Sequence, residues 1–91
     1  YAQFNLQKEG MVKTQLRKHI TMDPKVMVGK PIIRGTRIPV ETIVRMVAQG
    51  IPEKKILKEY PRLTLNDIRA ALTYAAGVVA HEDVFPFDIP A

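Results

Sequence analysis

The feature that most constrains the fold is a helical repeat of apolar residues, interrupted by glycine and proline, that runs from residue 39 to residue 80. In its first segment apolar residues recur at spacings of three and four, at Val40, Ile43, Val44 and Val47. This spacing places them on one face of a helix. Gly50 suits the position after a helix, and Pro52 and Pro61 bound a two-turn second segment. The pattern predicts short helices joined by tight turns.

A longer third helix is predicted from Leu65 to Ala80. Thr64 and Asp67 have the spacing of a capping box, in which each side chain accepts a hydrogen bond from the backbone of the other. The helical repeat assigns five residues to its buried side, Ile68, Ala71, Leu72, Ala75 and Val79. It assigns six to the opposite face, Asn66, Arg69 and Thr73 with Ala70, Gly77 and Ala80 beside them.

A β-hairpin is predicted before these helices, with Arg34-Gly35-Thr36-Arg37 at its tip. Gly35 suits the first central position of a type II′ turn, where φ is positive. Arg34 and Arg37 would then oppose each other on one face, with Ile33 and Ile38 on the other. Two interpretations stay open: an anion between the arginines, or two solvated arginines on an exposed tip.

These elements predict a mainly α fold, a three-helix helix-turn-helix domain with a short N-terminal β-hairpin. We divide the chain into an N-terminal arm (residues 1–19), the helix-turn-helix domain (residues 20–80) and a C-terminal tail (residues 81–91). At 91 residues the chain has a small core, so self-association as a homodimer would add stability.

Composition argues against several classes of function. The chain has no Cys and no Ser, so disulfides, thiolate zinc sites and the usual acyl-transfer nucleophiles are not possible. His19 and His81 are far apart in sequence, and no other metal-ligand spacing occurs. No apolar run approaches the roughly 20 residues of a membrane span. We therefore expect a cytoplasmic protein without cofactor or metal that is not an enzyme.

Charge divides the chain into two unequal parts. Residues 1–77 hold all 14 Lys and Arg and six of the nine acidic residues, a net charge of +8. Residues 78–91 hold three acidic residues and no Lys or Arg, a net charge of −3. Clustered positive charge suits a phosphate backbone, although it also simply promotes solubility.

In a helix-turn-helix the second helix enters the major groove of DNA. Asn66, Arg69 and Thr73 can contact adenine, guanine and the thymine methyl group, respectively. Positive side chains nearby are candidates for contacts with phosphates and DNA, namely Lys54, Lys55, Lys58, Arg62, Arg34 and Arg37. The alternative is a homo-oligomeric protein-interaction module that does not bind DNA.

The tail mixes acidic with large apolar residues, and Pro86 and Pro90 exclude a regular helix. Its apolar residues are candidates for partner binding, namely Val84, Phe85, Phe87 and Ile89. Equally, these side chains could cover the core of the domain or of a twin subunit.

Two runs, GKPIIRGTRIPV at residues 29–40 and YPRLTLNDIRAAL at residues 60–72, make the chain resemble the prokaryotic family catalogued as domain of unknown function 433. The resemblance extends over about residues 20–76. Val28 departs from the pattern, because many members have a second Gly there.

This resemblance implies a homeodomain-like three-helix fold. It also implies an antitoxin that binds its own operator and masks a ribonuclease toxin similar to PIN domains. The resemblance assigns no catalytic residues.

Overall fold

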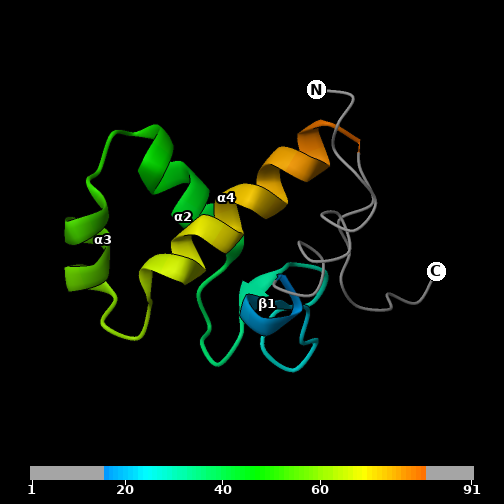
Figure 1. The fold of residues 1–91 in the computed structure, drawn as a ribbon. Coiled ribbons are helices and arrows are strands. Elements are labelled where there is room, and N and C mark those ends of the chain that lie inside the picture. The colour runs from blue at the N-terminus through cyan, green and yellow to red at the C-terminus, as the bar shows by residue number, and fades with distance from the viewer. Residues whose placement is uncertain (1–15, 82–91) are drawn as a thin grey trace.

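Two short strands followed by helices form the part of the chain that the structure describes (Figure 1). The structure is a computed structural model, and it describes residues 16–81. The elements are, in order, β1 (Ile20–Thr21), β2 (Ile32–Ile33), α2 (Val40–Ala48), α3 (Glu53–Glu59) and α4 (Leu65–Val79). This arrangement confirms a small, mainly α fold with a short antiparallel strand pair. Predictions for residues 1–15 and 82–91 lie outside the described residues.

The first helix, α2, ends as its sequence predicts. Gly50 follows it with a φ of 80°, a conformation that glycine adopts without strain. The N–H of Gly50 donates to the carbonyl of Val47, and the N–H of Ile51 donates to the carbonyl of Met46. These two bonds form a Schellman motif, which satisfies carbonyls that the helix leaves open. The turn connects α2 to α3, which begins at Glu53.

The third helix, α4, begins with the predicted capping box. The Asp67 N–H donates to Thr64 Oγ1 at 3.1 Å, and the Thr64 N–H donates to Asp67 Oδ2 at 3.0 Å. The two bonds satisfy backbone donors that the first turn of a helix cannot satisfy internally. They fix the start of α4 at Leu65, directly after the capping residue Thr64.

The predicted buried side of α4 is right near its start and wrong near its end. Ile68 and Ala71 are fully buried, whereas Val79 is 79% exposed. Ala70 and Gly77, assigned to the exposed face, are buried instead. The C-terminal part of α4 extends past α2 and α3 (Figure 1). Residues 16–21 approach the helix from the side of Ala70.

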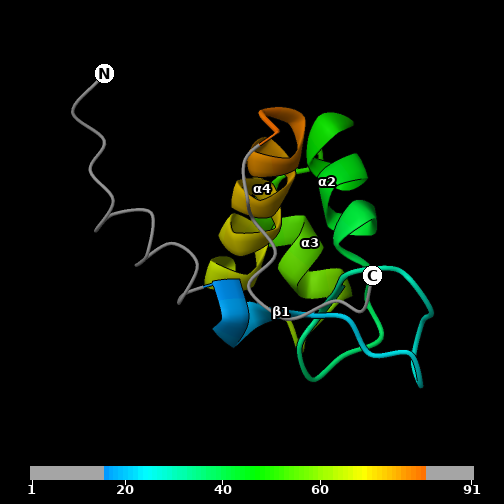
Figure 2. The same ribbon diagram turned by 90° about the vertical axis from the view of Figure 1, so that its right-hand side faces the viewer.

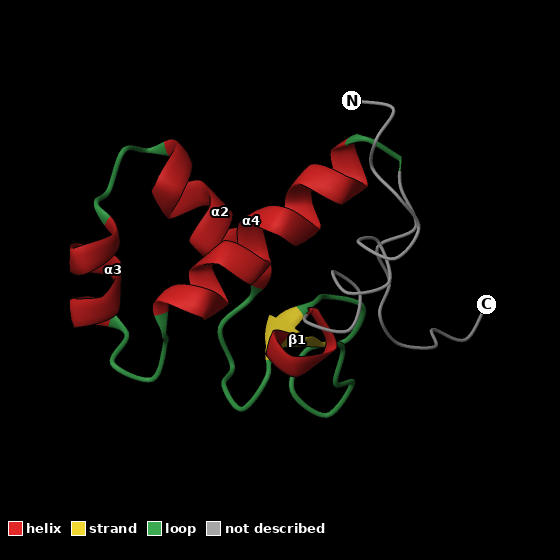
Figure 3. Cartoon of the chain, viewed as in Figure 1, coloured by secondary structure: helices red, strands yellow, loops and turns green. Residues whose placement is uncertain are grey.

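The strand pairing differs from the predicted hairpin. β2 pairs with β1 in antiparallel register, Ile20 opposite Ile33 and Thr21 opposite Ile32. The predicted pairing of β2 with residues 38–40 is reduced to a bridge between Ile32 and Pro39. Two backbone hydrogen bonds flank this bridge, from the Ile33 N–H to the Ile38 carbonyl and from the Val40 N–H to the Pro31 carbonyl, and the pairing ends there because α2 begins at Val40. The connection between β1 and β2 is a long loop, drawn in green in Figure 3.

The turn at the tip is also of another type. The Thr36 N–H donates to the Ile33 carbonyl at 3.0 Å, so Gly35 is the third residue of the turn, with a φ of 82°. A positive φ at that position alone is the type II arrangement, not the predicted type II′. The four residues from Arg34 to Arg37 therefore form a wider loop, and the two arginines are not a directly opposed pair.

An isoleucine from each element meets at the centre of the domain. These five side chains have no exposed surface, namely Ile20, Ile33, Ile43, Ile56 and Ile68. α4 packs against both α2 and α3, and α2 lies behind α4 in the first view and beside it in the second (Figures 1 and 2). Within residues 16–81, no helix has both the length and the apolar character needed to cross a membrane.

Candidate nucleic-acid interface

One exposed face of α4 carries the side chains predicted to read bases. Asn66, Arg69 and Thr73 follow one another along it at spacings of three and four residues, and all three are exposed. The opposite face of this half of the helix holds Ile68 and Ala71 in the core. The polar groups are therefore available to a ligand, as predicted. Binding to DNA stays a prediction.

Residues 16–19, assigned to the N-terminal arm, pack with the domain. They are helical, and Leu16 is only 2% exposed within the core cluster. Leu16 and Ile20 are four residues apart, so both point inward from this turn of helix. That i, i+4 spacing is the signal that could have found the anchor in the sequence. The packed domain therefore begins at least four residues before residue 20.

A histidine joins this segment to the start of α4. His19 Nδ1 lies 2.7 Å from Asp67 Oδ1, and the two side chains are largely buried. An ionised carboxylate can only accept, so His19 donates from Nδ1. Asp67 thus uses one oxygen for His19 and the other for the capping box. This contact, which links residues 48 positions apart, was not predicted.

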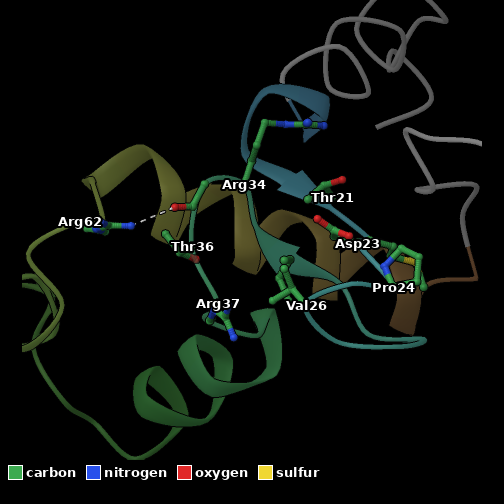
Figure 4. A pocket seen from close by; sticks show the side chains of 11 residues that line it. Thr21, Asp23, Pro24, Val26, Arg34, Thr36, Arg37 and Arg62 are labelled. Atoms are coloured by element: carbon green, nitrogen blue, oxygen red, sulfur yellow. Dashed lines mark hydrogen bonds between the residues drawn. The ribbon is translucent and has the colours of Figure 1, made fainter.

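The two arginines of the tip do not share a face. Arg34 Nε donates to the carbonyl of Arg17 at 2.9 Å, which draws the side chain toward residues 16–21. Arg37 is exposed and points toward α2, away from Arg34 (Figure 4). The prediction that the two arginines oppose each other is wrong, because the type II turn and the bond to the Arg17 carbonyl separate their side chains.

Arg62 is the predicted site residue that comes closest to this loop. It lies in the turn between α3 and α4, and its Nη1 is 3.5 Å from the Gly35 carbonyl, a long hydrogen bond (Figure 4). Arg34, Arg37 and Arg62 line one open depression of about 510 Å³ together with the loop after β1. The depression brings three positive side chains to the end of the domain where α4 begins.

The three lysines of α3 are all exposed. Lys54, Lys55 and Lys58 lie on the solvent side of the helix, whereas Ile56 is buried. No carboxylate in the described part of the chain forms an ion pair with them. They remain candidates for phosphate contacts.

Other cations of the domain are neutralised locally. Glu41, in the first turn of α2, pairs with Lys30 and lies 3.7 Å from Arg45. The hydrogen bond from Lys30 lowers the pKa of Glu41, so this carboxylate stays ionised at neutral pH. Residues 16–81 hold twelve Lys and Arg against five Asp and Glu, a net charge of +7. Of these, the cations without an ion pair lie on α3, on α4, in the turn between them, at the tip, at residues 17–18 and at Lys25.

Two further predictions concern partner binding and metal binding. The partner-binding candidates Val84, Phe85, Phe87 and Ile89 lie outside the described residues. Among residues 16–81, no three His, Asp or Glu side chains gather in a way that could hold a metal ion.

The fold recurs in a crystal structure of a DUF433 member protein from Anabaena variabilis ATCC 29413. The two chains are 35% identical, the TM-score is 0.64, and the match covers 88% of this chain and 82% of the other. A protein named "Uncharacterized protein y4eO" from Sinorhizobium fredii is 37% identical over 59 residues, which is 65% of this chain. This chain spans only 27% of that relative's length.

A second, shorter relative matches part of this chain. An uncharacterized protein from Archaeoglobus fulgidus is 59% identical over 29 residues, which is 32% of this chain and 81% of the relative. The family model described as "Protein of unknown function (DUF433)" matches residues 20–75, from β1 through most of α4. The chain therefore belongs to the DUF433 family.

Proposed function

We propose that the chain binds double-stranded operator DNA through α4 and acts as the antitoxin of a toxin–antitoxin pair. The DNA half rests on one observation: Asn66, Arg69 and Thr73 are exposed along the first nine residues of α4, the helix that follows α3. An amide, a guanidinium and a hydroxyl on one face of a helix can read base edges in the major groove. The lysines of α3 and Arg62 would contact the flanking phosphates.

A homodimer fits this mode of binding. Helix-turn-helix dimers contact two half-sites about 34 Å apart, so each subunit need read only a few base pairs. The proposal places the protein in the cytoplasm with its DNA and assigns it a binding role without catalysis. It names no cofactor.

The toxin half rests on the composition of the tail. Acidic and large apolar residues alternate there, which suits docking on a basic protein surface. We infer a ribonuclease-like toxin similar to PIN domains as the partner. By binding toxin and operator with different parts, the protein would regulate its own synthesis.

The first test is a titration of the full chain on duplex DNA from the region upstream of its own gene, at several salt concentrations. Log affinity should fall linearly with log salt concentration. Arg69→Ala should cost about 1–3 kcal/mol at one base position and relax the preference there. Lys55→Ala should weaken binding to all sequences alike. Equally weak binding of the wild type to every duplex would contradict the DNA half.

A protein-interaction module without DNA binding is the alternative function, and one observation favours it. Val78 and Val79, near the end of α4, are 45% and 79% exposed, which is unusual for adjacent aliphatic side chains. This alternative predicts that deletion of residues 82–91 abolishes capture of the protein encoded beside this chain, whereas Arg69→Ala changes nothing. If the deletion leaves capture intact, the tail is not the docking segment.

A further inference from the structure

A second depression lies directly beside the face of α4 that carries Asn66 and Arg69. It has a volume of about 600 Å³ and runs between residues 16–19 and the N-terminal half of the helix. Its lining comes from both sides, Leu16, Lys18 and His19 from the segment and Asn66, Arg69, Ala70 and Thr73 from α4. The sequence predicted that this face of α4 binds DNA by itself. In the structure the face is one wall of a depression, and residues 16–19 form the other wall.

The segment that forms the other wall is held at several independent points. Leu16 and Ile20 are buried in the core, and the His19 ring bonds to Asp67. The Arg34 N–H donates to the His19 carbonyl at 2.7 Å, and its Nε donates to the Arg17 carbonyl. Because the backbone on both sides of Lys18 is held, folding has already placed this residue beside α4, and a ligand need not order the segment that carries it.

The chemistry of the two walls is complementary to an extended anion. Lys18 supplies an ammonium from one wall and Arg69 a guanidinium from the other, while Asn66 and Thr73 add neutral donors. Among residues 16–81, no carboxylate lines the depression, and the nearby Asp67 is buried and already bonded to His19 and Thr64. Phosphodiester oxygens match this set of donors.

We propose that residues 16–19 form part of the DNA-binding surface and that Lys18 contacts the sugar-phosphate backbone bordering the groove that α4 occupies. This inference rests on the proposed function and adds a contact to it. The major groove is about 12 Å wide, so a segment packed against the flank of a helix in that groove meets one of its phosphate walls. An ammonium is a point charge that does not distinguish bases, so Lys18 contributes affinity and register without base preference.

The family model begins at residue 20, so Lys18 lies just before the residues that the model matches. Arg69 and Lys18 then have separable effects. Removal of Arg69 should change which duplex is preferred, whereas removal of Lys18 should weaken binding to every duplex alike.

The test is a fluorescence titration of the full chain with a labelled duplex from its own upstream region and with a scrambled duplex, from about 50 to 200 mM salt. Lys18→Ala is compared with Lys25→Ala, a matched loss of one exposed charge. Lys25 lies in the loop between β1 and β2 and lines neither depression. Thermal unfolding of each variant verifies that the fold is intact.

We expect Lys18→Ala to reduce the slope of log affinity against log salt by about 0.9, the value for one lost phosphate contact, and to lower affinity about five- to tenfold at 0.1 M salt. Lys25→Ala should leave the slope unchanged. Equal slopes for the two variants, with wild-type binding intact and Arg69→Ala still altering base preference, would overturn the role of Lys18 while leaving the proposed function in place. Absence of salt-dependent binding by the wild type would overturn both.

Discussion

At the scale of single residues, Asp67 connects more of the molecule than any other polar side chain of the described segment. One of its oxygens caps α4, and the other holds His19, so the helix start and residues 16–19 share one carboxylate. A side chain that accepts hydrogen bonds from two segments distant in the sequence holds those segments together. This bond is one of several contacts that hold residues 16–19 beside α4.

His19→Ala removes the bond and should lower the free energy of unfolding by about 1 kcal/mol, the net value of a largely buried hydrogen bond. His19→Asn should recover part of that loss, because its amide nitrogen occupies nearly the position of Nδ1. Lys18→Ala, an exposed change at the adjacent residue, serves as the control. Urea denaturation measures all three, and equal stability of His19→Ala and the control would show that the bond contributes nothing.

At the scale of elements, the helices follow from residues that are close together in sequence. Gly50 ends α2, and Thr64 with Asp67 starts α4, through contacts that reach no more than five positions. Such signals are local, and the sequence alone therefore predicts them.

Thr64→Ala tests the cap that sets the beginning of α4. Loss of the hydroxyl leaves the Asp67 N–H with only the Thr64 carbonyl as its acceptor and should destabilise the protein by about 1 kcal/mol. Thr73→Ala is the matched control, because Thr73 is exposed in the middle of the same helix and alanine is the better helix former. If thermal unfolding shows Thr73→Ala to be as destabilising as Thr64→Ala, the cap is not what stabilises this end of α4.

The strand pair shows where sequence reasoning fails. Nothing near Ile20 or Ile33 indicates that these two residues pair, since thirteen positions separate them and no periodic pattern links them. The tip appeared to be a two-residue hairpin because Gly35-Thr36 suits that turn, but Gly35 is the third residue of a type II turn, and the pairing beyond it ends where α2 begins at Val40. The contact between His19 and Asp67 was missed for the same reason: it joins residues 48 positions apart.

At the scale of the whole molecule, the helix pattern and the charge could be predicted, but the surface they form could not. The sequence indicated Asn66, Arg69 and Thr73 as one face, and they are exposed together. It did not indicate that Lys18 lies across a depression from them. It also placed Arg34 and Arg37 opposite each other, although the loop turns them apart. A surface formed by segments that are distant in the sequence depends on tertiary packing, and tertiary packing produces no repeating pattern in the sequence.

The central claim is that the N-terminal half of α4 and the segments beside it meet duplex DNA. The most direct measurement is the NMR spectrum of the ¹⁵N-labelled full chain, titrated with duplex from its own upstream region. We predict that the largest amide shift changes occur in residues 16–19 and 62–73, with small changes in α2. Changes confined to α2 or to the exposed valines at the end of α4, or no changes at all, would contradict the claim.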